Sequence, residues 1–142
     1  MKFILPGNVA IKNKKNGQFL SVKQGRLVMT ETSQGKNSEW LWKSIKENEF
    51  WGVIIAGNSE YDLTPLPWLG VPSISNWQKG TIPVSLSFWG NSRRPLWRRS
   101  GNKIISSQAA YLAQDEFGKI IGLSSTNNDN RTWDLLELEI QG

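Results

Sequence analysis

Three tryptophans, Trp68, Trp77 and Trp89, stand in the middle of the sequence among Pro, Gly, Ser and Asn. Turn-forming residues stiffen such a segment, and an indole face offers apolar area at little entropic cost. Sugars suit this surface, because their axial C–H bonds form an apolar face and their hydroxyl groups need fixed donors and acceptors. The run from Phe88 to Asn91 supplies rings, accessible backbone and an amide, with Leu86 and Trp77 nearby. We therefore expect the middle of the chain to carry a binding surface.

The residue types that are missing exclude several kinds of chemistry. The chain has no Cys and no His, so it cannot form a disulfide, a thiolate nucleophile, a Cys/His zinc site or a Ser-His-Asp triad. Its carboxylates show no paired arrangement for glycosidic cleavage, and no Gly-rich loop matches a phosphate-binding pattern. The cluster from Asn127 to Asn130 leaves two interpretations open, a Ca²⁺ or hydroxylated-ligand site and a solvated turn, of which the turn is favoured. We expect no enzyme activity, no cofactor and no metal.

The net charge of +5 indicates possible anionic partners, but the excess is local. Five cations crowd one stretch: Arg93, Arg94, Arg98, Arg99 and Lys103. Because Trp97 divides them and is expected inside, we interpret the stretch as solvated surface and do not expect nucleic-acid binding.

No apolar run is long enough to span a bilayer, and the apolar run before Pro6 is too short for a secretory signal. These features, with the absence of Cys, favour a cytoplasmic protein without membrane insertion.

Short β-branched or aromatic segments separated by Gly-Asn and similar pairs predict an all-β fold without helices. The expected strands cover Val9–Ile11, Phe19–Val22, Arg26–Met29, Gly52–Ile55, Val84–Leu86, Lys103–Ile105, Tyr111–Ala113, Lys119–Ile121 and Asp134–Leu138. This spacing is typical of a sandwich, a barrel or a repeat array.

An internal repeat favours the last of these. Residues 18–45 align with residues 110–138 when one residue is inserted, so that Gly25 meets Gly118 and Arg26 meets Lys119. A more divergent third copy lies between them. Each unit closes on a tryptophan: Trp40, Trp97 and Trp133. Units this short bury too little alone, so we expect them to share one core around a pseudo-threefold axis, with the closing indoles inside. Trp42 and Trp51 are expected to be buried as well.

These three units, with the pattern W-x-x-x-G-x-x-I that begins at Trp97, resemble the β-trefoil of ricin-B-type lectins, and the lack of Cys is most like small fungal members. The resemblance implies one domain over residues 1–142, with three pseudo-repeats at about 8–48, 49–99 and 100–142 and a longer loop in the middle one. It also implies a non-catalytic, carbohydrate-binding lectin. The expected partner is the glycan of a glycoprotein or glycolipid, the expected state is a monomer or homodimer, and the expected biological role is defence.

The same resemblance implies roles for residues of the second unit. Asp62 would accept hydrogen bonds from sugar hydroxyls, Trp77 and Trp89 would stack on the ring, and Asn91 would bind ring substituents. Gly90 would expose backbone, and Leu86 would pack against a methyl or acetyl group. The corresponding positions, taken as Ser21 and Ala113, are poorer, which predicts one competent site.

Alternatives remain at this point. The two indoles could instead plug an enlarged loop onto the barrel, and Asp62 could form a local hydrogen bond to backbone. A β-trefoil protease inhibitor that uses the rigid loop of residues 65–72, and an actin- or anionic-surface-binding scaffold, are the other functions that the sequence leaves open.

Overall fold

The structure is a computed structural model, and it describes residues 8–45, 48–57, 59–65, 81–89, 94–107, 110–123 and 134–140. Within these ranges the chain forms strands and one short 3₁₀ turn, η1 (Gly35–Ser38). The strands are β1 (Asn8–Asn13), β2 (Phe19–Lys23), β3 (Arg26–Thr30), β4 (Trp40–Ile45), β5 (Asn48–Ala56), β6 (Tyr61–Pro65), β7 (Thr81–Phe88), β8 (Trp97–Ser100), β9 (Lys103–Ser106), β10 (Tyr111–Gln114), β11 (Ile120–Leu123) and β12 (Asp134–Ile140).

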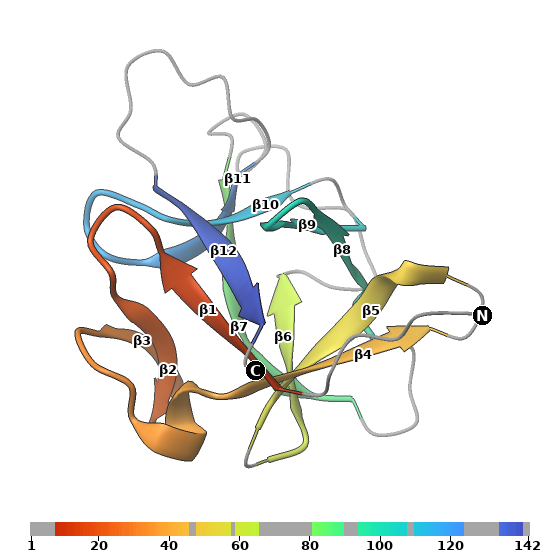
Figure 1. The fold of residues 1–142 in the computed structure, drawn as a ribbon, viewed down its shortest axis with the longest axis horizontal. Coiled ribbons are helices and arrows are strands. Elements are labelled where there is room, and N and C mark those ends of the chain that lie inside the picture. Colours follow the sequence, from red (N-terminus) through yellow and green to blue (C-terminus); the bar gives the residue numbers. More distant parts are fainter. Residues whose placement is uncertain are drawn as a thin grey trace.

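Six of the strands close into a ring. Strand β1 pairs with β4, β4 with β5, β5 with β8, β8 with β9, β9 with β12, and β12 returns to β1, all antiparallel. Figure 1 shows these strands crossing one another around the body of the molecule. A closed ring leaves no free sheet edge along these pairs, which protects their backbone hydrogen bonds.

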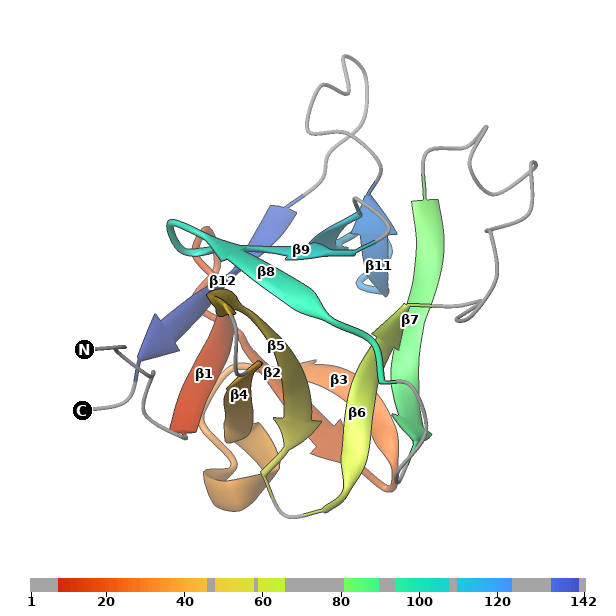
Figure 2. The same cartoon turned by 90° about the vertical axis from the view of Figure 1, so that its right-hand side faces the viewer.

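The other six strands form three hairpins, β2–β3, β6–β7 and β10–β11. The first strand of each hairpin also pairs with the ring strand before it, at Lys12 and Phe19, at Ile55 and Asp62, and at Ile105 and Tyr111. Strands β7 and β11 pair with each other as well, so two hairpins are joined directly. Figure 2 shows β6 and β7 side by side, next to the segment that leads into β8.

The core is built on indoles that make equivalent contacts. Trp40 and Trp97 are both 0% exposed, and their Nε1 atoms donate to the backbone oxygens of Leu20 and Leu63, each at 2.9 Å. Each closing tryptophan thus ties the end of its segment to the hairpin before it. The expected burial of these two residues is confirmed, while Trp133 lies outside the described residues.

Each of the nine expected strands falls on an observed strand, and the all-β expectation is confirmed. Three observed strands, β4, β6 and β8, are not among the nine, and β4 and β8 both begin at a tryptophan that the sequence marked only as the end of a unit. Trp42 is 1% exposed, as expected, whereas Trp51 is only half-buried. No helix in the part of the chain that the structure describes has the length and apolar character needed to cross a bilayer.

Candidate functional site

The outward face of the β6–β7 hairpin carries a row of polar side chains. Successive side chains of a strand point to opposite faces, so Asp62 and Thr64 lie opposite the core residue Leu63. The register pairs Asp62 with Ser87 and Thr64 with Ser85. The hairpin therefore presents an apolar face to the core and a hydroxyl-rich and acidic face away from it.

Arg94 lies against this face and forms a bidentate pair with Asp62. Its Nε donates to Oδ2 and its Nη2 donates to Oδ1, each at 3.0 Å. Asp62 is 0% exposed, and the Arg94 side chain keeps 28% of its surface exposed. Two parallel charge-assisted hydrogen bonds fix the plane of the guanidinium. Arg94 is therefore a rigid cation at the surface, held by a carboxylate beneath it.

Burial decides the protonation behaviour of this pair. Desolvation raises the pKa of the Asp62 carboxyl above its ordinary value of 3.8, and the hydrogen bonds and charge of Arg94 oppose the rise without cancelling it. The cause is the cost of an ionised group that is removed from water. The pair consequently loses its negative member at a less acidic pH than an exposed Asp would.

Thr64 joins the pair to Trp89. The Trp89 Nε1 donates to Thr64 Oγ1 at 3.0 Å, and the Thr64 hydroxyl donates to the backbone oxygen of Asp62 at 3.0 Å. Trp89 is half-buried, so part of the indole remains accessible while its polar edge is anchored. We call Trp89, Thr64, Asp62 and Arg94 the hairpin network. It fixes an aromatic ring at one end and a cation at the other.

A hollow of about 200 Å³ adjoins Arg94. Its wall comes from β4, β5, β7, the segment after β5 and the segment before β8: Leu41, Lys43, Ile55, Ser59, Glu60, Phe88 and Arg94. Phe88 is 59% exposed and meets Tyr61 edge-on, with ring centroids 6.1 Å apart. Asp62 binds Arg94 through Nε and Nη2, so the Nη1 donors are not used by that carboxylate. The hollow thus combines an exposed ring with directed N–H donors.

The structure brings together two of the residues predicted for the site, Asp62 and Trp89. Asp62 has both carboxylate oxygens occupied by Arg94, so in this arrangement it acts on a ligand through Arg94. Leu86 lies on the other face of β7, where it packs against the core cluster. Trp77, Gly90 and Asn91 lie outside the described residues, as do Trp68, residues 66–72 of the predicted inhibitor loop and the cluster from Asn127 to Asn130.

The alignment of Ser21 with Asp62 is corrected by the structure. Because Trp40 bonds Leu20 and Trp97 bonds Leu63, these leucines correspond, and Ser21 corresponds to Thr64 rather than to Asp62. The Ser21 hydroxyl is buried and lies 2.7 Å from Ser38 Oγ and 2.8 Å from Thr30 Oγ1. The first hairpin therefore holds a cluster of neutral hydroxyls where the second hairpin holds Thr64 and an indole.

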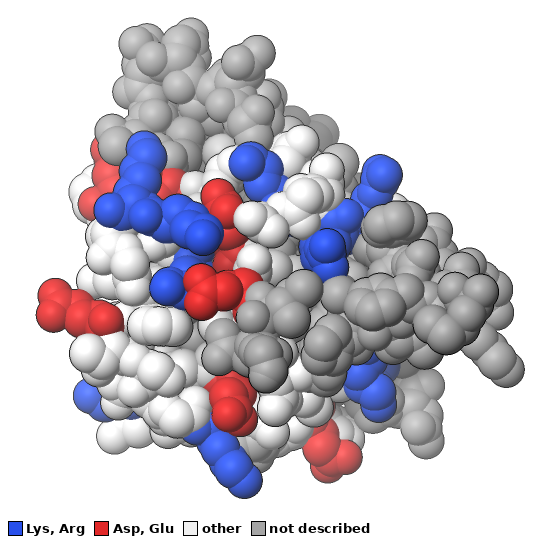
Figure 3. All heavy atoms as spheres, viewed as in Figure 1, with Lys and Arg blue, Asp and Glu red and all other residues white. Residues whose placement is uncertain are grey.

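The cationic stretch around Trp97 is divided as expected. Along β8, Trp97 is buried and Arg98 is exposed, while the Arg99 Nε donates to the Gly101 oxygen at 3.1 Å. On the face that Figure 3 shows, Lys and Arg are interspersed with Asp and Glu among the described residues. The prediction of a solvated surface was wrong for Arg94, because its guanidinium pairs with the buried Asp62 in the hairpin network.

No protein-family model and no curated protein sequence matches this chain. Solved structures do. The designed threefold-symmetric protein ThreeFoil matches with a TM-score of 0.63 and 16% identity, over 92% of this chain and 98% of its own. A Macrolepiota procera ricin B-like lectin, solved in complex with lactose, matches with a TM-score of 0.61 and 14% identity, over 95% of this chain and 98% of its own.

The C-terminal domain of an earthworm lectin, a mutant solved in complex with 6'-sialyllactose, matches with a TM-score of 0.56 and 16% identity, over 96% of this chain and all of its own. The fold is a β-trefoil. The trefoil matches ricin B-like lectins across nearly the whole chain, which confirms the resemblance expected from the sequence. At these identities the likeness establishes the architecture, and the chemistry has to be argued from the residues of this chain.

Proposed function

We propose that this protein is a carbohydrate-binding lectin without catalytic activity, and that its glycan site lies on the outward face of the β6–β7 hairpin. The hairpin network carries the proposal. It holds an aromatic face and a directed hydrogen-bond donor on one side of a rigid strand pair, which is the combination that a pyranose needs. The trefoil neighbours solved with lactose and with 6'-sialyllactose support the same ligand class.

Each residue of the network then has a distinct role. The Trp89 indole packs against the apolar face of the sugar, and its orientation is set by the hydrogen bond to Thr64. The Nη1 group of Arg94 donates to a sugar hydroxyl or carboxylate. Asp62 is a positioning residue, because both of its oxygens are occupied by the guanidinium. Trp77, Gly90 and Asn91 complete the site in this proposal, in the roles that the family resemblance implies.

The proposal includes three pseudo-repeats, of which the middle one, with its long loop, carries the competent site. In the first repeat the Ser21 hydroxyl, which corresponds to that of Thr64, contacts the hydroxyls of Thr30 and Ser38, whereas Thr64 accepts a hydrogen bond from an indole. Binding per site should be modest, since sugars lose hydrogen bonds to water when they bind. A second site or a homodimer would have to supply avidity.

A glycan array tests the proposal. The labelled wild-type protein should bind a subset of glycans, and Trp89→Ala should abolish that binding. Phe117→Ala is the matched control, because Phe117 is an exposed aromatic residue, 81% accessible, in the β10–β11 turn. Near-ultraviolet circular dichroism and thermal unfolding verify that each variant is folded. A folded wild-type protein that binds no glycan would refute the proposal, as would full binding by folded Trp89→Ala.

A further inference from the structure

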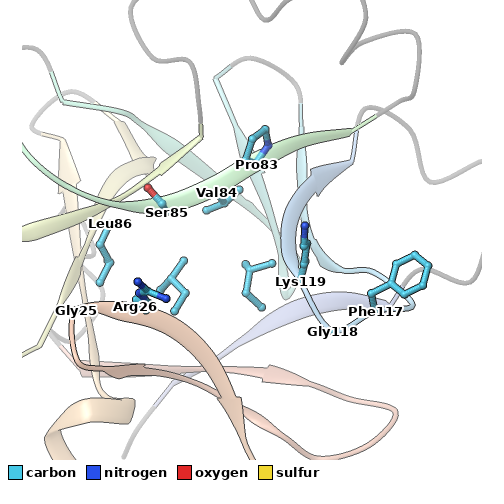
Figure 4. Close-up of a pocket in the computed structure, with 11 residues that line it drawn as sticks. Gly25, Arg26, Pro83, Val84, Ser85, Leu86, Phe117, Gly118 and Lys119 are labelled. Carbon is cyan, nitrogen blue, oxygen red and sulfur yellow. The ribbon is translucent and has the colours of Figure 1, made fainter.

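A second and larger pocket, of about 490 Å³, lies between the turns of two hairpins and strand β7. Figure 4 shows it bounded by the β2–β3 turn, the β10–β11 turn and the middle of β7. Leu27, Val84, Leu86 and Ile120 form its apolar wall, and each of these is buried or half-buried against the main core. The apolar wall of the pocket is therefore part of the core-facing side of the β6–β7 hairpin, whereas the hairpin network lies on the opposite face of that hairpin.

Two cations stand at this pocket, Arg26 and Lys119. Each directly follows a glycine with positive φ, Gly25 at 75° and Gly118 at 87°. The turns require those glycines, since other residues are strained there. The turns have no such requirement for a cation at the next position, yet both hairpins place one there. Figure 4 shows Arg26 and Lys119 on two different sides of the hollow, whereas the Phe117 ring points away from it.

No Asp or Glu is among the described residues that line the pocket. Asp115 lies four residues before Lys119, and its Oδ1 accepts hydrogen bonds from the backbone N–H groups of Phe117 and Lys119, at 2.9 and 2.8 Å. The Oδ1 atom of Asp115 is thus used in shaping the turn. Among the described residues, the ion pairs found do not include Arg26 or Lys119. Two cations thus flank an apolar wall without an acidic partner lining it.

We propose that this pocket binds a small organic anion that carries an apolar ring or chain. The apolar part would cover Leu27, Leu86 and Ile120, and the carboxylate, sulfate or phosphate would lie between Arg26 and Lys119. Both cations would attract a bound anion, and the apolar wall would strengthen this attraction by excluding water. A free ligand fits better than a lipid in a bilayer, because the apolar wall is recessed between turns. The site is independent of glycan binding.

Fluorescent aryl probes test this proposal on the intact protein. Anilinonaphthalene sulfonate carries both parts of the expected ligand, and phenylnaphthylamine carries the rings without the charge. The wild-type protein should bind the sulfonate saturably at one site, and more weakly as salt is added. Arg26→Gln and Lys119→Gln should each weaken sulfonate binding about 10-fold, the size expected when one charge-assisted hydrogen bond is removed. Binding of the uncharged probe should not change.

Matched controls separate the pocket from general charge effects. Arg98→Gln and Lys36→Gln remove cations that are exposed elsewhere, on β8 and in η1, and should leave sulfonate binding unchanged. Dodecanoate should displace the sulfonate, and phosphatidylglycerol vesicles at the same total concentration should not. Displacement by the vesicles would overturn the assignment to a free ligand. Absence of saturable binding, or equal binding by the folded Arg26→Gln/Lys119→Gln double variant, would overturn the site itself.

Discussion

Asp62 and Arg94 are 32 positions apart in the sequence, yet the carboxylate of Asp62 accepts two hydrogen bonds of 3.0 Å from the guanidinium of Arg94. The pair ties strand β6 to the segment that leads into β8. It therefore has two consequences, one for the stability of the hairpin and one for the orientation of the cation that faces the hollow beside Phe88.

The free-energy costs of removing Asp62 and Arg94 should not be additive, because a single removal leaves the other partner buried without its ion pair. Arg94→Gln leaves a carboxylate that is 0% exposed without its cation, and we expect it to cost about 2 kcal/mol. Asp62→Asn/Arg94→Gln should cost less than the sum of the single changes, with a coupling of about 1–2 kcal/mol. Chemical denaturation of the four proteins measures this cycle. If the costs of the two single changes simply add up to the cost of the double change, the interaction between Asp62 and Arg94 does not stabilise the fold.

The pH dependence of stability should carry the signature of Asp62. Its pKa is raised by burial, so the folded protein holds this proton more tightly than the unfolded chain does. The contribution of Asp62 to the free energy of unfolding is therefore fully present below the unfolded value of 3.8 and is lost as the pH rises through the higher folded pKa. Asp62→Asn lacks this titration.

Thermal unfolding of the wild type and of Asp62→Asn across this pH range measures the effect. The stability of the wild type relative to the variant should decline as the pH rises through that window. An increase over the same window would mean that Arg94 lowers the pKa of Asp62 below 3.8 despite its burial.

Thr64→Val tests whether the anchor of Trp89 matters. The substitution keeps the shape of the side chain but removes the hydroxyl that accepts from the indole at 3.0 Å. We expect a loss of about 1 kcal/mol in stability. Glycan affinity should fall several-fold, because the indole is no longer held in one orientation. Thr30→Val changes a hydroxyl of the first hairpin and should leave glycan affinity intact. Equal glycan affinities for the wild type and Thr64→Val would show that Thr64 does not contribute to glycan binding.

The two closing indoles should be equally important to the fold. Trp40→Phe and Trp97→Phe each delete a buried 2.9 Å hydrogen bond to a leucine oxygen and leave space in the core. We expect each to cost about 2–4 kcal/mol. Phe117→Ala, at an 81% exposed position, should change stability by less than about 0.5 kcal/mol. Unequal effects at the two tryptophans would argue against equivalent positions in the trefoil.

The sequence predicted the fold well because the information for it is local. Alternating apolar residues and turn-forming pairs mark the strands, and the closing tryptophans mark a shared core. The same emphasis on unit ends hid β4 and β8, since a residue taken as the end of a unit is in fact the first residue of a ring strand. Ring closure depends on pairings between distant strands, such as β1 with β12, which the local pattern does not contain.

The site was predicted less well, because it depends on contacts between distant residues. Asp62 and Trp89 were found from their types, but Arg94 looked like one of several cations in a row. The sequence contained one usable signal: Asp62 alternates with the core residue Leu63 on a strand, and an acid beside the core needs a cation. The position of Ser21 was misaligned by two residues, since the divergent second hairpin offers few landmarks before Leu63.

The most direct test of the central claim is a calorimetric titration with a glycan that the array identifies, using wild type, Arg94→Gln and Arg94→Lys. The account predicts that Arg94→Gln reduces affinity at least about 10-fold, as expected for the loss of a charge-assisted hydrogen bond. Arg94→Lys should also bind weakly, because an ammonium cannot pair in a bidentate way with Asp62. Wild-type affinity in folded Arg94→Gln would contradict the claim that the hairpin network forms the glycan site.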